Sequence, residues 1–85
     1  MMNGADEIRS ALSERFKKAS KRGAKYVEIN SGDFGRELKI YPYPNRMPNL
    51  CRIMRGEMQS RDTITSKTRV GYDGPRLSIR YLLPR

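Results

Sequence analysis

The sequence contains no histidine, and Cys51 is its single cysteine. Without histidine the chain has no His-based general base, no Ser-His-Asp triad, no His-dependent metal nuclease motif and no two-Cys two-His zinc finger. One thiol supports neither an intramolecular disulfide nor a Cys-cluster metal site. We therefore expect no metal and no cofactor, and we interpret Cys51 as a small buried hydrophobic residue.

Long hydrophobic runs are also lacking. No apolar segment approaches the roughly 20 residues of a membrane-spanning helix, and the N-terminal residues carry no signal-peptide core. These features predict a cytoplasmic protein that does not enter a membrane. Of the 85 residues, 36% are hydrophobic and 32% are charged, which is enough apolar material for one small core. Residues 1–85 are therefore expected to form a single domain.

Acidic residues are scarce relative to basic ones. Eighteen Lys and Arg against nine Asp and Glu give a formal net charge of +9, and twelve of the basic residues are Arg. Arg makes planar bidentate contacts to phosphate and guanine, whereas Lys often serves solubility alone. This charge points to a polyanionic partner, first of all nucleic acid.

Catalytic patterns are absent as well. The carboxylates considered for such chemistry are Glu28, Asp33, Glu37 and Asp62. They are scattered among basic residues at spacings typical of surface ion pairs, without a nucleophile–base pair or a phosphate-cradling glycine motif. We do not expect the protein to be an enzyme.

The N-terminal part of the chain is predicted to be helical. Apolar residues at four-, four- and three-residue steps indicate an amphipathic helix over residues 3–22. These residues are Ile8, Leu12, Phe16 and Ala19. Asn3 is the expected N-cap of this helix, and Gly23 is its expected stop.

Shorter elements follow. Residues 25–29 are predicted to form a short strand, and residues 31–38 a short second helix. Residues 39–46 form a connector, because Pro42 and Pro44 break any helix.

A third helix is expected to start near Met47, with Pro48 at the first helical position. The helical spacing of its buried side continues as far as Met58. The opposite side carries Asn49, Arg52, Arg55, Gly56 and Gln59.

Two strands are predicted after this helix. Residues 62–66 form the first, with Ile64 facing the core, and residues 76–82 form the second, in which apolar and polar residues alternate strictly. Residues 67–75 between them are rich in turn-forming residues. The predicted fold is therefore α+β, with three helices packed on a small antiparallel sheet of two to three strands and a hairpin loop.

The order helix, strand, helix, helix, strand, loop, strand resembles the winged helix-turn-helix superfamily over residues 6–82. In that superfamily three helices pack on a small antiparallel sheet, and the hairpin loop forms the wing. Residues 46–54 (RMPNLCRIM) and 77–85 (LSIRYLLPR) are also similar to a group of small uncharacterised prokaryotic proteins, which brings no function with it. The connector is longer than the three or four residues of a compact helix-turn-helix.

The winged-helix resemblance implies that the third helix enters the major groove. Arg pairs bidentately with guanine, and Asn and Gln do so with adenine. The residues that fit this role are Arg46, Asn49, Arg52, Arg55 and Gln59. A solvated helix face would carry similar residues, and that alternative stays open.

The wing would comprise residues 67–74, where Lys67 and Arg69 reach phosphates or a minor groove. Arg76 and Arg80, on the exposed side of the last strand, would extend this basic surface; an ordinary solvated hairpin is the alternative. We therefore expect a nucleic-acid-binding protein, with double-stranded DNA favoured, in a transcriptional or mobile-element role. The sequence leaves open whether it acts as a monomer or a homodimer.

Two other functions remain open. Tyr41 and Tyr43, beside Lys39 and Arg46, would stack on unpaired bases if the protein binds single-stranded nucleic acid or RNA, although such tyrosines more often pack in a core. A protein-binding module or phage-type inhibitor would instead engage an acidic or nucleic-acid-binding protein partner.

Overall fold

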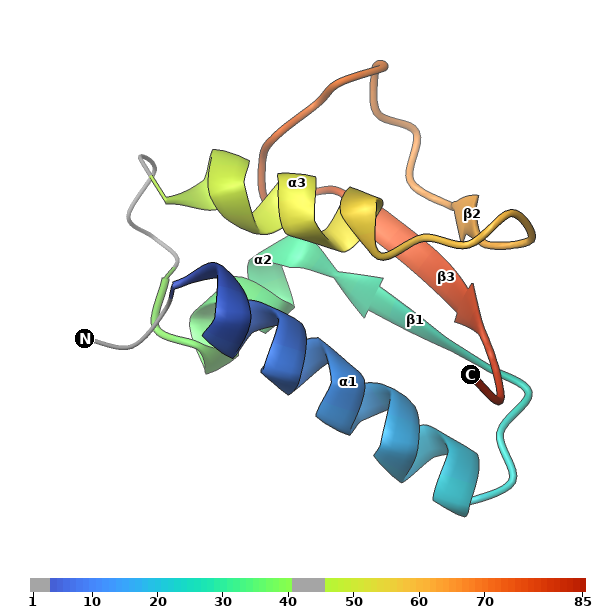
Figure 1. The fold of residues 1–85 in the computed structure, drawn as a ribbon. Coiled ribbons are helices and arrows are strands. Elements are labelled where there is room, and N and C mark those ends of the chain that lie inside the picture. The colour runs from blue at the N-terminus through green and yellow to red at the C-terminus, as the bar shows by residue number, and fades with distance from the viewer. Residues whose placement is uncertain (1–3, 41–45) are drawn as a thin grey trace.

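The computed structural model describes residues 4–40 and 46–85, whose arrangement is shown in Figure 1. In these residues the chain forms three helices and a three-stranded antiparallel sheet, which is the α+β layout predicted from the sequence. The elements are α1 (Ala5–Lys21), β1 (Tyr26–Asn30), α2 (Ser31–Glu37), α3 (Met47–Gly56), β2 (Thr63–Ile64) and β3 (Ser78–Leu82). The predictions for Asn3, Tyr41, Pro42, Tyr43 and Pro44 lie outside the described residues.

The helix α1 follows the predicted apolar pattern. Its buried residues are Ile8, Leu12, Phe16 and Ala19. At its N-terminus the backbone N–H of Gly4 donates to Glu7 Oε1 at 3.1 Å. The helix ends at Lys21 and is followed by Gly23 with a φ of 80°, a left-handed conformation that glycine adopts without strain. Gly23 therefore acts as the predicted stop.

The sheet has the order β1-β3-β2, so the last strand lies between the other two. β1 and β3 pair antiparallel, with Ile29 opposite Ile79 and Val27 opposite Tyr81. Ile79 and Tyr81 are buried while Arg80 between them is exposed, as the predicted alternation requires. Because successive strand residues point to opposite faces, Arg80 lies on the sheet face turned away from the helices.

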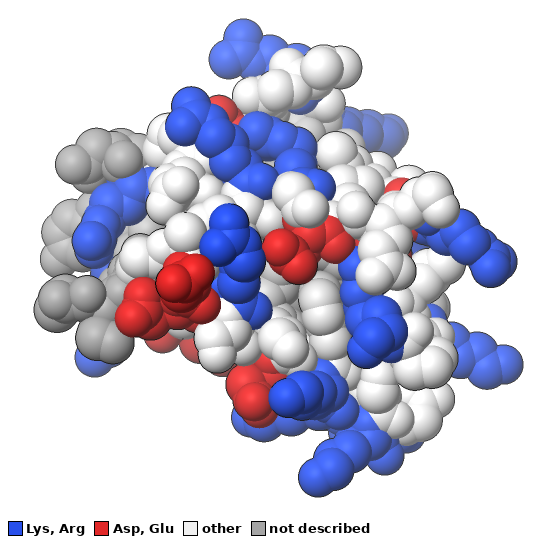
Figure 2. Space-filling view, viewed as in Figure 1, with Lys and Arg blue, Asp and Glu red and all other residues white. Residues whose placement is uncertain are grey.

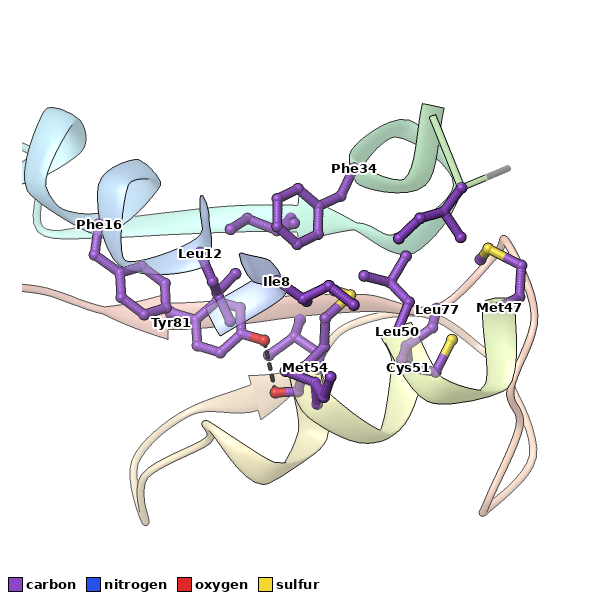
Figure 3. Packing of buried hydrophobic residues seen from close by; sticks show 14 residues of the cluster. Ile8, Leu12, Phe16, Phe34, Met47, Leu50, Cys51, Met54, Leu77 and Tyr81 are labelled. Atoms are coloured by element: carbon purple, nitrogen blue, oxygen red, sulfur yellow. Dashed lines mark hydrogen bonds between the residues drawn. The ribbon is translucent and has the colours of Figure 1, made fainter. Parts of the chain in front are cut away.

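The core lies where side chains from the three helices meet those of β3 (Figure 3). Phe16 of α1 and Tyr81 of β3 have ring centroids 4.8 Å apart. The Tyr81 hydroxyl donates a hydrogen bond to the Met54 carbonyl oxygen at 2.7 Å. Burial raises the pKa of Tyr81, so this hydroxyl keeps the proton that it donates. Cys51 is buried in the same cluster, as predicted.

The N-terminus of α2 depends on a close backbone approach. The Asn30 side chain caps the helix by accepting a hydrogen bond from the Asp33 N–H at 3.0 Å. A Cβ on Gly32 would lie 2.7 Å from the Pro75 carbonyl oxygen. The Gly32 N–H donates to that same oxygen at 3.0 Å. Glycine thus lets α2 attach directly to the segment that precedes β3.

Two predicted details of α3 and β2 are wrong. The helix ends at Gly56, before Met58, and the chain then turns so that the Gln59 N–H donates to Asp62 Oδ2 at 2.7 Å. β2 contains only two residues, and Ile64 is 40% exposed instead of facing the core. Ile64 pairs with Ile79 of β3 from the edge of the sheet, where a strand flanks it on one side only.

Candidate nucleic-acid interface

The outward face of α3 carries polar side chains. The opposite face is buried and consists of Met47, Leu50, Cys51, Ile53 and Met54. Asn49 and Arg52 are three residues apart, so they lie on the same side of the helix, and both are exposed. Arg46, the N-cap of α3, is exposed as well. These three predicted contact residues are therefore accessible on or beside one helix.

Arg55 is half-buried, because it contacts the loop between β2 and β3, which we call the hairpin loop (residues 65–77). Its Nη2 lies 2.6 Å from Asp73 Oδ1, and its Nη1 donates to the Tyr72 carbonyl oxygen at 2.7 Å. The Arg52 Nε lies 4.0 Å from the other Asp73 oxygen, and the Arg52 side chain is 68% exposed. Asp73 therefore ties the hairpin loop to α3 mainly through Arg55 and leaves Arg52 accessible.

The end of the hairpin loop is fixed by two further bonds to one acceptor, the Gly74 carbonyl oxygen. Ser31 Oγ donates to it at 2.6 Å, and Cys51 Sγ donates at 3.4 Å. Burial raises the pKa of the Cys51 thiol, so the thiol stays protonated and acts as a donor. The Ser31 backbone N–H also donates to the Leu77 carbonyl oxygen at 2.7 Å. α2, α3 and the hairpin loop are thus connected by hydrogen bonds.

The outer part of the hairpin loop carries cations without acidic partners. Lys67 and Arg69 are exposed, and neither forms an ion pair with any residue that the structure describes. Val70 beside them is fully exposed. Gly71, with a φ of 78°, provides the turn that follows. This part of the loop therefore exposes one apolar side chain and two cations that form no ion pair with a described residue.

Arg80 is not brought together with the α3 face. It lies on the far face of the sheet, where its Nη2 is 3.7 Å from Glu28 Oε1. Its Cζ also lies 4.6 Å from the centroid of the Tyr26 ring. A duplex seated on α3 could meet Arg80 only by extending around the edge of the sheet.

Gln59 and Arg76 lie at the margins of the predicted site. Gln59 is exposed but follows the end of α3, so it sits at the opposite end of the helix from Arg46. Arg76 is exposed at the end of the hairpin loop, with its Cζ 5.7 Å from the centroid of the Tyr72 ring. The structure therefore groups Asn49, Arg52 and the loop more tightly than it groups the whole predicted set.

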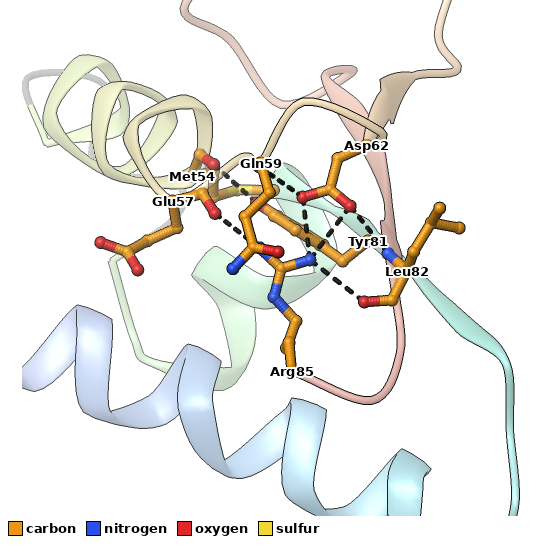
Figure 4. A network of polar contacts seen from close by, with 7 residues as sticks. All are labelled: Met54, Glu57, Gln59, Asp62, Tyr81, Leu82 and Arg85. Atoms are coloured by element: carbon orange, nitrogen blue, oxygen red, sulfur yellow. Dashed lines mark hydrogen bonds and ion pairs between the residues drawn. The ribbon is translucent and has the colours of Figure 1, made fainter.

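The sequence interpretation missed a polar network at the end of α3, shown in Figure 4. The side chains of Asp62 and Arg85 are only 1% and 7% exposed, with Arg85 Nη1 2.8 Å from Asp62 Oδ2. The backbone N–H groups of Gln59 and Leu82 donate to the same carboxylate at 2.7 and 2.8 Å. Arg85 Nη2 donates to the Glu57 carbonyl oxygen at 2.7 Å. These partners are far apart in the sequence, so no local pattern could have revealed them.

This network fixes the charge state of Asp62. Burial alone would raise the pKa of the carboxyl group, but hydrogen bonds from two backbone N–H groups and from Arg85 outweigh burial. The pKa of Asp62 is therefore below its ordinary value, and the group is ionised at neutral pH. The network joins the end of α3 to β3 and has a structural role.

The positive charge is distributed over separate regions. Figure 2 shows basic side chains over α3 and the loop above it, and again at the lower end of the molecule, where α1 ends. Acidic side chains lie between these groups on the visible face. The charge of the chain is therefore not confined to the predicted interface.

Comparisons of the chain with protein-family models, curated proteins and solved structures found no match. None of the described helices is long and apolar enough to cross a membrane. Residues 4–40 and 46–85 contain no group of three or more His, Cys, Asp or Glu side chains that could hold a metal ion. A proposal for the function therefore rests on the geometry and charge of the described residues.

Proposed function

We propose that the protein binds double-stranded DNA, with α3 as the recognition helix in the major groove and the hairpin loop as the wing. The observation that carries this proposal is the contact between Arg55 and Asp73, which holds the loop beside the helix. A duplex reader needs both parts in a fixed relation, because base-edge contacts specify sequence while phosphate contacts set register. The order of the helices and strands supports a winged-helix assignment.

Asn49 and Arg52 are the side chains best placed to read bases. Both are exposed on α3, and their amide and guanidinium groups match the major-groove edges of adenine and guanine. The contact between Arg52 and Asp73 is weak, because the atoms are 4.0 Å apart and the Arg52 side chain is largely exposed. Arg52 therefore gives up little interaction energy with Asp73 when it turns toward DNA. Arg46 would hold a phosphate near the start of α3.

Lys67 and Arg69 supply the charge of the wing. Neither must break an ion pair with a described residue before it meets a phosphate or enters a minor groove. Each such contact releases counterions and makes the affinity depend on salt. Gln59, Arg76 and Arg80 would contact flanking phosphates at most, given their positions at the margin of the site.

Binding to duplex DNA, single-stranded DNA and RNA of matched length, measured across a salt series, tests the proposal. We expect duplex binding that persists at about 0.15 M salt and favours some sequences. Equal binding to all three polymers, or binding that is lost at this salt, would contradict it. The genomic positions of the preferred sequences would then test a transcriptional or mobile-element role.

Binding of a protein partner is the second candidate function, favoured by exposed apolar side chains at the hairpin loop. Val70 is fully exposed and Ile64 is 40% exposed. Both line an open hollow of about 530 Å³, together with Tyr72 and Leu77. In this case DNA binding would be weak and purely electrostatic, without sequence preference. The salt series therefore separates the two candidates.

A further inference from the structure

A second cluster of cations lies at the end of α1. It comprises exposed side chains from the last turns of the helix and the segment that follows, and we call it the α1-end surface: Lys17, Lys18, Lys21, Arg22 and Lys25. None of them forms an ion pair with residues 4–40 or 46–85. The nearest carboxylate along the helix belongs to Glu14, which shares an open hollow of about 570 Å³ with the first three of these lysines.

Arg55 on α3 differs in this respect. It contacts Asp73 at 2.6 Å, so a DNA phosphate must compete with that carboxylate for it, whereas Arg52 is only weakly held at 4.0 Å. At the α1-end surface a phosphate meets no such competition from a described residue. A polyanion can therefore neutralise these cations at no cost in broken ion pairs.

The stability of α1 accounts for only part of this cluster. Cations gain from the helix dipole mainly within the last turn, which contains Lys18 and Lys21. Like charges four residues apart repel each other, and Lys17 is four residues from Lys21, as Lys18 is from Arg22. The cations of this surface therefore repel one another, and a bound polyanion would relieve that repulsion.

Figure 1 places the end of α1 and the hairpin loop at opposite ends of the molecule. We propose that the α1-end surface binds the phosphates of a second DNA segment, so that one protein molecule bridges two duplexes. This inference rests on the proposed function, because the first duplex occupies α3 and the hairpin loop. Four of the five cations are lysines, which meet phosphate as point charges, so the second contact is independent of sequence.

A capture assay measures bridging. One biotinylated duplex of about 30 base pairs is held on beads, limiting protein is added, and a fluorescent duplex of different sequence is supplied in solution at about 0.15 M salt. We expect the wild-type protein to capture the second duplex. The variant Lys18→Gln/Lys21→Gln should reduce capture about tenfold and change binding to a single duplex by less than about twofold.

The matched control is Ser10→Glu/Lys39→Gln, which lowers the net charge equally at exposed positions outside both surfaces. We expect this control to keep capture within about twofold of wild type, because capture depends on the cations at the end of α1 and not on the net charge of the protein. Lys18→Arg/Lys21→Arg retains the charges and should also retain capture.

Several results would overturn the inference. Equal capture by Lys18→Gln/Lys21→Gln and the control would show that bridging does not use this surface, including the case in which a homodimer bridges through two copies of α3. A parallel loss of single-duplex binding would assign the end of α1 to the first DNA site. Tighter wild-type binding to vesicles of anionic lipid than to duplex would assign the surface to a membrane. Failure of the wild type to bind even one duplex would instead contradict the proposed function itself.

Discussion

The guanidinium of Arg55 and the carboxylate of Asp73 meet at 2.6 Å, although the two residues are 18 positions apart in the chain. The same guanidinium donates to the Tyr72 carbonyl oxygen at 2.7 Å, so one side chain holds two consecutive residues of the hairpin loop. Arg55 follows Arg52 by three residues on α3, close to the face proposed to read DNA. We therefore assign Arg55 a positioning role, with Arg52 as the residue that contacts bases.

Arg55→Ala is expected to lower the free energy of unfolding by about 1–2 kcal/mol, because it removes two charge-assisted hydrogen bonds from a partly exposed site. The loosened loop should weaken binding to every duplex. Arg55→Lys should lose most of the same stability and duplex affinity as Arg55→Ala, since an ammonium group cannot reproduce the two contacts of the guanidinium group. Denaturant unfolding measures the loss of stability, and hydrogen exchange measures the loosening of the hairpin loop. Exchange of the Tyr72 amide, which donates to the Arg69 carbonyl oxygen, should accelerate; an unchanged rate would argue against the positioning role.

Arg69→Ala is expected to weaken binding to all duplex sequences alike. Loss of one phosphate contact should reduce the slope of log affinity against log salt concentration by about 0.9. Titrations at several salt concentrations measure the slope, with Lys39→Gln as a control that removes one charge outside the proposed interface. A changed sequence preference with an unchanged slope would be inconsistent with a phosphate-binding wing.

Asp62→Ala is expected to lower the free energy of unfolding by about 3–5 kcal/mol, because it leaves Arg85 buried without its partner. Glu28→Gln serves as the comparison, since Glu28 and Arg80 are both half-exposed at a distance of 3.7 Å. That substitution should cost less than about 1 kcal/mol. Thermal and denaturant unfolding of both variants give the values, and similar costs would mean that the buried network contributes no more than a surface pair.

The stability of the protein should depend on acid through Asp62. Its pKa is lower in the folded protein than in the unfolded chain, so the unfolded chain takes up the proton first as the pH falls. The stabilisation is therefore present above about pH 4 and is lost progressively below it. Unfolding measured between about pH 2 and pH 7 should show a shallower acid limb for Asp62→Asn than for wild type. Parallel curves would show that other carboxyl groups cause the acid sensitivity.

The elements with strong periodicity could be predicted from the sequence. α1 repeats its apolar residues at helical spacing, and β3 alternates between buried and exposed side chains, so both patterns identify the element and its buried face. The α+β layout follows from the order of such segments. Local sequence patterns did not predict the end of α3 at Gly56 or the exposure of Ile64. These features depend on the surroundings of the segment in the folded protein and not on its own periodicity.

The candidate site was predictable as a set of residue types but not as an arrangement. Helical spacing correctly indicated that Asn49 and Arg52 share an exposed face. It could not indicate that Asp73, expected only as a turn former, would hold Arg55. Arg80 was expected to extend the same basic surface, yet the alternation of β3 turns it to the far face of the sheet. The contact between Arg55 and Asp73 joins segments that are distant in the sequence, whereas the position of Arg80 follows from the alternation of β3 once the helices cover its other face.

The reading of DNA by α3 is tested most directly with Arg52→Ala. Wild type and variant would be titrated at about 0.15 M salt with a duplex selected by the wild type and with a scrambled duplex of equal length. We expect the discrimination between the two duplexes to fall by roughly 1–3 kcal/mol in the variant, while the affinity for the scrambled duplex changes little. Undiminished discrimination in Arg52→Ala, or no discrimination by the wild type, would contradict it.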